Sequence, residues 1–132
     1  MSDNSGFISI DEICRKIMKG TVLDIFYIIQ EHEYVFKSEI MRRFVEFDED
    51  PEAKENKYRF VVQEGIAMLE GALFIDSHRS GKKDCYYLTP YGLQARDIVA
   101  ELIEGTPAIL FDSKITKTIM EQGAAINGTG EN

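Results

Sequence analysis

Apolar residues recur every three or four positions in three separate stretches of the chain. This spacing places them on a single face of a helix. The third stretch has a well-defined start, because Thr89 can cap a helix and Pro90 fits a first helical position. The pattern therefore predicts helices over residues 9–19, 57–70 and 91–104.

Residues 22–29 are apolar nearly all round, so periodicity alone leaves a central helix and a buried strand both open. Thr21, with Asp24 three positions later, resembles a capping box, and the length of the segment also favours a helix. We interpret this segment as the helix at the centre of the domain.

A further helix is predicted over residues 37–47, after a short link at residues 32–36. Its apolar positions face the core, which leaves Arg42 and Arg43 available to solvent. The acidic loop that follows, residues 48–56, contains several carboxylates but no basic partner fixed nearby. Such a run is usually a solvated loop.

A hairpin is predicted between the helices over residues 57–70 and 91–104. Residues 73–75 are typical of a strand, residues 79–83 of a tight turn and residues 85–88 of a returning strand. The returning strand leads directly into the next helix through Thr89 and Pro90. The chain thus alternates from helices to a hairpin and back to a helix.

We expect one domain over residues 1–122, because the chain is long enough to bury a core without disulfides or metal. Its core spans about residues 20–104, with flanking helices at 9–19 and 107–122. The second flanking helix follows a cap-like Asp-Ser pair and has apolar residues at helical spacing. Residues 123–132 have the composition of a flexible tail.

The segment over residues 67–99 resembles the end of a winged helix-turn-helix in MarR- and PadR-like transcriptional regulators. These proteins follow a helix with a strand, a basic wing tip and a returning strand of the pattern Y-x-L-T-x-x-G, which Tyr86, Leu88, Thr89 and Gly92 match. The resemblance covers roughly residues 20–104. It implies a mainly α (α+β) fold with a two-stranded wing and additional N- and C-terminal helices.

The same resemblance implies a DNA-binding surface. Residues 57–70 would be the recognition helix, residues 78–83 the basic wing, and part of the preceding helix would lie near the DNA backbone. The candidate DNA-binding residues are Ser38, Arg42, Arg43, Lys57, Arg59, Phe60, Gln63, His78, Arg79, Lys82 and Lys83.

Charge is distributed unevenly along a chain whose net charge is −8. Residues 57–83 hold five Lys/Arg against three Asp/Glu, a net of +2, whereas the segments on both sides are acidic. A local basic patch can contact phosphate even when the whole chain is acidic. No run approaches the ~18 apolar residues of a membrane span, and no signal peptide is recognisable, so we expect a cytoplasmic protein.

The sequence gives little support for catalysis or metal binding. Cys14 and Cys85 are most simply buried thiols, and neither they nor His32 and His78 show the close spacing of a zinc site. There is no Gly-rich phosphate loop and no nucleophile elbow. We therefore expect no enzyme, no metal and no cofactor.

Two functions remain open. The first is a transcriptional regulator that binds double-stranded DNA, as a homodimer through residues 9–19 and 91–122. The second is a winged-helix module that binds a protein partner through its acidic surface and an exposed Phe60. Glu64 on the recognition helix and the acidic loop before it are the features that favour the second function.

Overall fold

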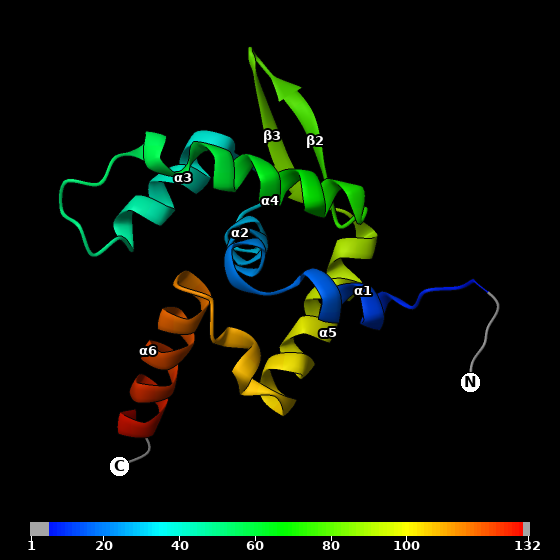
Figure 1. The fold of residues 1–132 in the computed structure, drawn as a ribbon, viewed down its shortest axis with the longest axis vertical. Coiled ribbons are helices and arrows are strands. Elements are labelled where there is room, and N and C mark those ends of the chain that lie inside the picture. Colours follow the sequence, from blue (N-terminus) through cyan, green and yellow to red (C-terminus); the bar gives the residue numbers. More distant parts are fainter. Residues whose placement is uncertain (1–5, 131–132) are drawn as a thin grey trace.

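The computed structural model describes the fold of residues 6–130 and the side chains of residues 6–123. It is mainly helical, with a small antiparallel sheet that projects from one end of the molecule (Figure 1). The elements are α1 Ile10–Ile17, α2 Gly20–Gln30, β1 Val35–Phe36, α3 Lys37–Glu46, α4 Arg59–Gly71, β2 Ile75–Ser80, β3 Lys83–Leu88, α5 Pro90–Gly105 and α6 Ile115–Gly130, with single 3-10 turns at Glu55–Tyr58 and Pro107–Leu110.

Helix α2 lies at the centre of the molecule, with α4 on one side and α1 and α5 on the other (Figure 1). Its apolar residues are buried almost all round, which confirms the central helix. The packing of α2 against α4 is close, because a Cβ on Gly65 would meet Ile25 Cδ1 at 2.2 Å. The nearly uniform apolar surface of α2 is thus packed against neighbouring elements on most of its sides.

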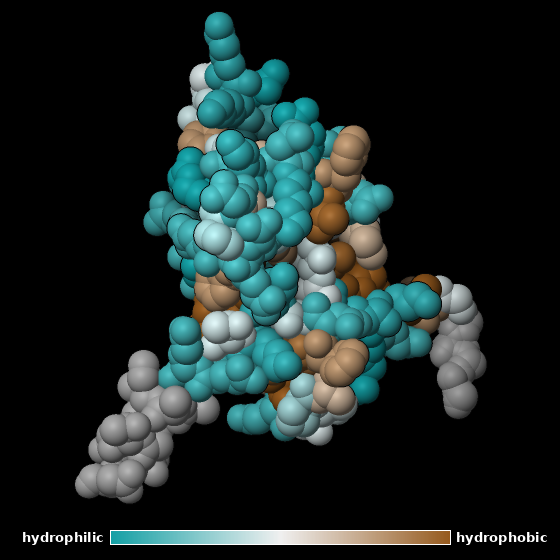
Figure 2. Space-filling model, turned by 60° about the vertical axis from the view of Figure 1, so that its left-hand side comes forward, coloured by the Kyte–Doolittle hydropathy of each residue, from teal (hydrophilic) through white to brown (hydrophobic). Residues whose placement is uncertain are grey.

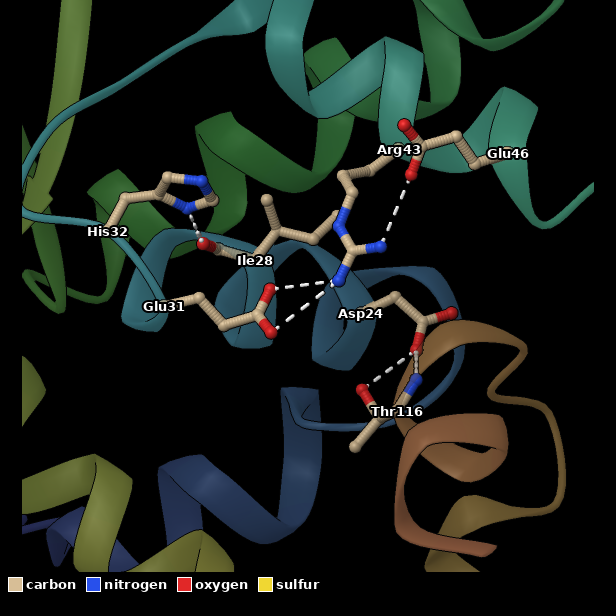
Figure 3. Close-up of polar contacts among 7 residues, drawn as sticks. All are labelled: Asp24, Ile28, Glu31, His32, Arg43, Glu46 and Thr116. Atoms are coloured by element: carbon tan, nitrogen blue, oxygen red, sulfur yellow. Dashed lines mark hydrogen bonds and ion pairs between the residues drawn. The ribbon is translucent and has the colours of Figure 1, made fainter. Parts of the chain in front are cut away.

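The predicted cap of this helix is wrong. Helix α2 begins at Gly20 without a side-chain cap, so Thr21 lies inside the helix. Asp24 is buried and turns instead towards the start of α6 (Figure 3).

The Asp24 carboxylate joins α2 to the C-terminal segment. It accepts hydrogen bonds from the Ser113 hydroxyl at 2.6 Å, from the Lys114 amide at 2.9 Å, and from both the amide and the hydroxyl of Thr116 at 2.9 Å each. Hydrogen bonds to an ionised group stabilise more than neutral ones, and an anion at a helix N-terminus is favourable. Asp24 therefore anchors α6 to the core from 92 positions away in the sequence.

The three strands pair in the order β1-β3-β2, all antiparallel. The hairpin of β2 and β3 confirms the sequence prediction, with Gly81 and Lys82 at its turn and Gly81 at a φ of +67°. Strand β1 was expected to be only a link. Its two residues, Val35 and Phe36, pair with β3. A strand of two residues is too short to show an alternating pattern in the sequence.

The start of the hairpin also differs from the prediction. Leu73 has a left-handed φ of 68° and is exposed, so it ends α4 rather than beginning a strand. Strand β2 begins at Ile75, two residues later than expected. The amide of Phe74 donates to the Leu69 carbonyl, which satisfies one of the last carbonyls of the helix.

The junction from strand to helix at Thr89 is confirmed. The Thr89 hydroxyl accepts from the Gly92 amide at 2.9 Å and donates to the Leu73 carbonyl at 2.6 Å. Gly92 lies against the backbone of Phe74, where a Cβ would come within 2.0 Å of the carbonyl oxygen. One threonine thus caps α5 and fixes it to the end of α4.

Several helix boundaries differ from the sequence predictions, and the first is that of α1, which ends at Ile17 rather than at residue 19. Helix α4 is preceded by a 3-10 turn that contains Lys57, so the regular helix starts at Arg59. At the C-terminus, a 3-10 turn precedes α6, and α6 extends through residues expected to form a tail, as far as Gly130. The last two residues of the predicted tail lie outside the described residues. No helix in the described part of the chain is both long and apolar enough to cross a membrane.

Candidate nucleic-acid interface

A groove of about 460 Å³ lies between the first turn of α3, the outer face of α4 and the β2–β3 hairpin. It brings together six of the eleven candidate residues, which come from three separate elements. The groove is lined by Phe36, Lys37, Ser38, Met41, Arg59, Gln63, Arg79, Lys82, Lys83, Asp84 and Tyr86.

The groove is strongly basic within an acidic chain. Five of its lining side chains are Lys or Arg, against one carboxylate, Asp84, which lies 3.4 Å from Arg79. Among the residues whose side chains the structure describes, no carboxylate lies within ion-pair distance of the other four, Lys37, Arg59, Lys82 and Lys83. We call these four the groove group. Their positive charge is available to an anionic ligand.

Local chain geometry explains why these side chains meet. The two-residue turn of the hairpin places Lys82 and Lys83 at its tip, and Lys83 Nζ lies 5.9 Å from the centre of the Phe36 ring. Arg59 and Gln63 are four residues apart on α4 and therefore share one face of it. Lys37, at the start of α3, donates from Nζ to Gln63 Oε1 at 3.1 Å.

The exposure predicted for Phe60, on the outer face of α4, is confirmed. Phe60 is 77% exposed, and Gln63, Glu64 and Ala67 are also exposed. Val61 belongs to the apolar positions of the predicted helix but is 38% exposed. The buried residues of α4 are Val62, Gly65, Ile66 and Leu69.

Arg43 was expected to be available to solvent, and this prediction is wrong. Its guanidinium lies 3.1 Å from Glu31 and 3.3 Å from Glu46, and it is half-buried (Figure 3). It also lies over the Phe47 ring, 5.2 Å from the ring centre. Arg43 therefore connects α3 to the end of α2 and lies outside the groove.

Arg42 and Lys57 are also paired with carboxylates, at the acidic loop. Arg42 lies 3.7 Å from Glu55, and Lys57 Nζ lies 2.7 Å from Asp48. Together with Arg43 they form what we call the paired group. Sequence analysis found no basic partner for the acidic loop, yet Lys57, nine positions after Asp48, is such a partner.

Asp48 fixes the acidic loop to the start of α4. Its carboxylate accepts from Lys57, from the Tyr58 hydroxyl and from the Asp50 amide. These hydrogen bonds hold the pKa of Asp48 well below its usual range. Burial and the neighbouring Asp48 raise the pKa of Tyr58 to about 12. The loop is thus attached by charge at Asp48, while most of its other residues are exposed, as predicted.

His78 lies on the opposite face of the hairpin from the groove. Its ring makes an edge contact with Tyr34, at 5.0 Å between ring centres, and Nε2 lies 3.6 Å from the Cys85 sulfur. Because successive residues of a strand point to opposite faces, Arg79 enters the groove and His78 does not. The predicted basic wing is therefore divided between two surfaces.

Figure 2 shows that hydrophilic side chains cover the projecting end of the molecule, whereas hydrophobic ones gather along one edge and lower down. Within the described residues no three His, Cys, Asp or Glu side chains lie together in a way that could hold a metal ion. Cys14 and Cys85 are buried thiols, and burial and the nearby Asp11 raise the pKa of Cys14 to about 11. At neutral pH the Cys14 thiol is protonated and unreactive.

Comparisons with protein-family models, with curated proteins and with solved structures give no match for this chain.

Proposed function

We propose that this protein is a transcriptional regulator that binds double-stranded DNA through a winged helix-turn-helix. In this proposal α2, α3 and α4 are the three helices of the motif, α4 is the recognition helix, and the β2–β3 hairpin is the wing. The order of the elements and the strand order β1-β3-β2 support this assignment. A cytoplasmic location, where DNA is accessible, belongs to the same proposal.

The observation that carries the proposal is the convergence of the groove group on one surface of an acidic protein. Cationic side chains from α3, α4 and the hairpin meet there with no carboxylate to neutralise them among the described side chains. A nucleic acid is a polyanion that would bind such a surface favourably, because each phosphate contact releases counterions. The acidic remainder of the chain then opposes nonspecific binding elsewhere on the protein.

The residues of the groove have different proposed roles. Arg59, Lys82 and Lys83 contact phosphates, and the Ser38 hydroxyl adds a backbone contact at the start of α3. Gln63 lies on the outer face of α4 and contacts base edges in the major groove. Phe60 is placed one turn away and contacts the sugar-phosphate backbone.

The proposal is tested by capture of fragmented genomic DNA on the purified protein, followed by sequencing. We expect enrichment of a short motif, and loss of that enrichment in the variant Arg59→Ala/Lys82→Ala/Lys83→Ala. The matched control, Arg42→Ala/Arg43→Ala/Lys57→Ala, removes the same number of charges from the paired group and should retain the motif. Recovery without any shared motif from the wild type would contradict sequence-specific regulation.

A protein-binding module is a second candidate, and exposed apolar residues on α4 favour it. Phe60 is 77%, Met68 46% and Val61 38% exposed on the outer surface of this helix. Aromatic and methionine side chains are enriched at protein interfaces. If this function applies, Phe60→Ser abolishes capture of a protein partner, while removal of the groove group leaves that capture unchanged.

We also propose a homodimer, because a single winged helix contacts only a short half-site. The N-terminal contribution expected from α1 is reduced, since Cys14 and Met18 are buried within the chain's own core. Exposed apolar residues remain at both ends of the described chain, with Phe7 at 87% and Ile8 at 68% before α1, and Phe111 at 81% and Met120 at 39% in the C-terminal segment. Light scattering on a sizing column should give a dimer that Phe111→Ser weakens, and a 15.1 kDa monomer at tens of micromolar would contradict it.

A further inference from the structure

We propose that Lys37 and Gln63 act as one base-reading pair that selects guanine. This inference rests on the proposed DNA binding and specifies which base the groove recognises. Lys37 lies in the first turn of α3 and Gln63 on the outer face of α4, and both line the groove. The pair thus joins the two helices at the surface that faces the ligand.

The contact between the two side chains fixes the orientation of the glutamine amide. Lys37 Nζ lies 3.1 Å from Gln63 Oε1. An ammonium group has only hydrogens to offer, so the amide oxygen must be the atom that faces it. The amide nitrogen then points away from Lys37, and it donates to no other group among the described residues.

This orientation changes what the glutamine can recognise. A glutamine that is not held in this way reads adenine, because its oxygen accepts from N6 while its nitrogen donates to N7. Here Lys37 already uses one of the two lone pairs of that oxygen, and the ammonium charge beside it disfavours the approach of a second donor such as the adenine amino group. The pair therefore presents mainly N–H donors, two from the amide and those that remain on the ammonium.

Guanine is the base that best matches a site in which donors predominate. In the major groove it offers two neighbouring acceptors, N7 and O6. Adenine and cytosine each present an amino donor there, which would meet a donor, and thymine adds a methyl group to its single acceptor. Each wrong base leaves an N–H of the pair without a partner.

Donors and apolar groups predominate around the pair, and the Ser38 and Tyr86 hydroxyls that also line the groove can either donate or accept. Arg59, one turn before Gln63, is a further donor, and Met41 is apolar. Asp84, the single carboxylate that lines the groove, lies beside Arg79 on the hairpin. Glu39, in the same turn of α3 as Lys37, accepts from the Phe36 amide at 2.8 Å. Both carboxylates thus already contact donors of the protein itself.

The experiment is selection of bound sequences from a random duplex pool by the wild type and by Lys37→Met and Gln63→Ala. The wild-type motif should contain a guanine that depends on both residues. In Lys37→Met the glutamine oxygen is released, so the preference at that position should change from guanine to adenine by about tenfold in relative enrichment. In Gln63→Ala the preference at that position should disappear while the rest of the motif remains.

Lys82→Met is the matched control, because it removes the same charge from the hairpin and leaves the pair intact. It should weaken binding without changing the motif. The inference is overturned if Lys37→Met keeps the same guanine that Lys82→Met keeps, or if no guanine of the motif depends on Gln63. If the wild type enriches no sequence at all, the proposed function itself fails, which is a different result from a motif that is indifferent to these two residues.

Discussion

Two groups of basic side chains lie on this protein within a short distance along the chain, and they differ in what surrounds them. The paired group, Arg42, Arg43 and Lys57, has a carboxylate within 3.7 Å of each cation. The groove group has none within ion-pair distance in the described part of the chain. The two groups carry similar formal charge, but the cations of the paired group are neutralised by carboxylates and those of the groove group are free to contact an anionic ligand.

The difference teaches that the position of the acidic residues decides which cations can bind a polyanion. The acidic loop folds against the C-terminal end of α3 and the start of α4, where Asp48 and Glu55 neutralise two basic residues. Exposed ion pairs contribute little to stability, but they remove charge that a phosphate would otherwise meet. The acidic loop thus confines the positive surface to the groove.

The largest expected effect is loss of the hairpin cations. Each phosphate contact adds a slope of ~0.9 to the salt dependence, which corresponds to about tenfold in affinity at ~0.1 M salt. Lys82→Ala/Lys83→Ala should therefore weaken DNA binding by about 100-fold at this salt. Fluorescence anisotropy with a labelled duplex measures the change. Wild-type affinity in this variant would remove the hairpin from the interface.

Arg59→Ala should weaken binding by about tenfold, because it removes one phosphate contact from α4. The same titration measures it. The side chain is exposed at the start of the helix, so thermal unfolding should hardly change. A large fall in the unfolding temperature would show instead that Arg59 acts through stability.

Arg43→Ala should have the opposite profile. We expect unchanged DNA affinity and a decrease of about 1 kcal/mol in the free energy of unfolding, since the half-buried guanidinium joins α3 to Glu31. Urea denaturation measures the stability and anisotropy the affinity. A fall in affinity as large as that of Arg59→Ala would break the distinction between the two groups.

Asp48→Asn should lower the unfolding temperature by an amount that depends on pH. Because the folded state lowers the pKa of Asp48, its contribution to stability is complete above the unfolded pKa of ~3.9 and is lost as pH falls through the lower folded value. The difference in unfolding temperature between wild type and variant should be constant near neutral pH and shrink below about pH 4. A difference that stays the same at acid pH would show that Asp48 is not held as a carboxylate.

Sequence reasoning was most successful where one local signal decides a structure. Thr89 and Pro90 start α5, and the turn around Gly81 closes the hairpin, because caps and turns depend on residues a few positions apart. The helical stretches followed from periodicity in the same way. Six of the candidate residues reach one groove because the order of elements brings α3, α4 and the hairpin together.

The features that could not be predicted from the sequence depend mainly on contacts between positions far apart in the chain. Asp24 was interpreted as part of a local cap, but its partners lie about 90 positions away on α6. Arg43 is neutralised by Glu31 from the preceding helix, and His78 is turned away from the groove by the pleat of its strand. The partners of Asp24 and Arg43 are properties of the assembled fold, whereas the orientation of His78 follows from the alternation of strand Ile75–Ser80, which is longer than the strand predicted at residues 73–75.

The central claim, that the groove group alone is available to phosphate, is tested most directly by the salt dependence of DNA binding. We would titrate a labelled mixed-sequence duplex at several salt concentrations with wild type and with Arg42→Ala/Lys57→Ala. The three groove cations assigned to phosphates, Arg59, Lys82 and Lys83, predict a slope of about −2.7 per bound chain for log affinity against log salt, with the same slope in the variant. A wild type whose binding does not depend on salt, or a variant whose slope falls by about 2, would contradict the account.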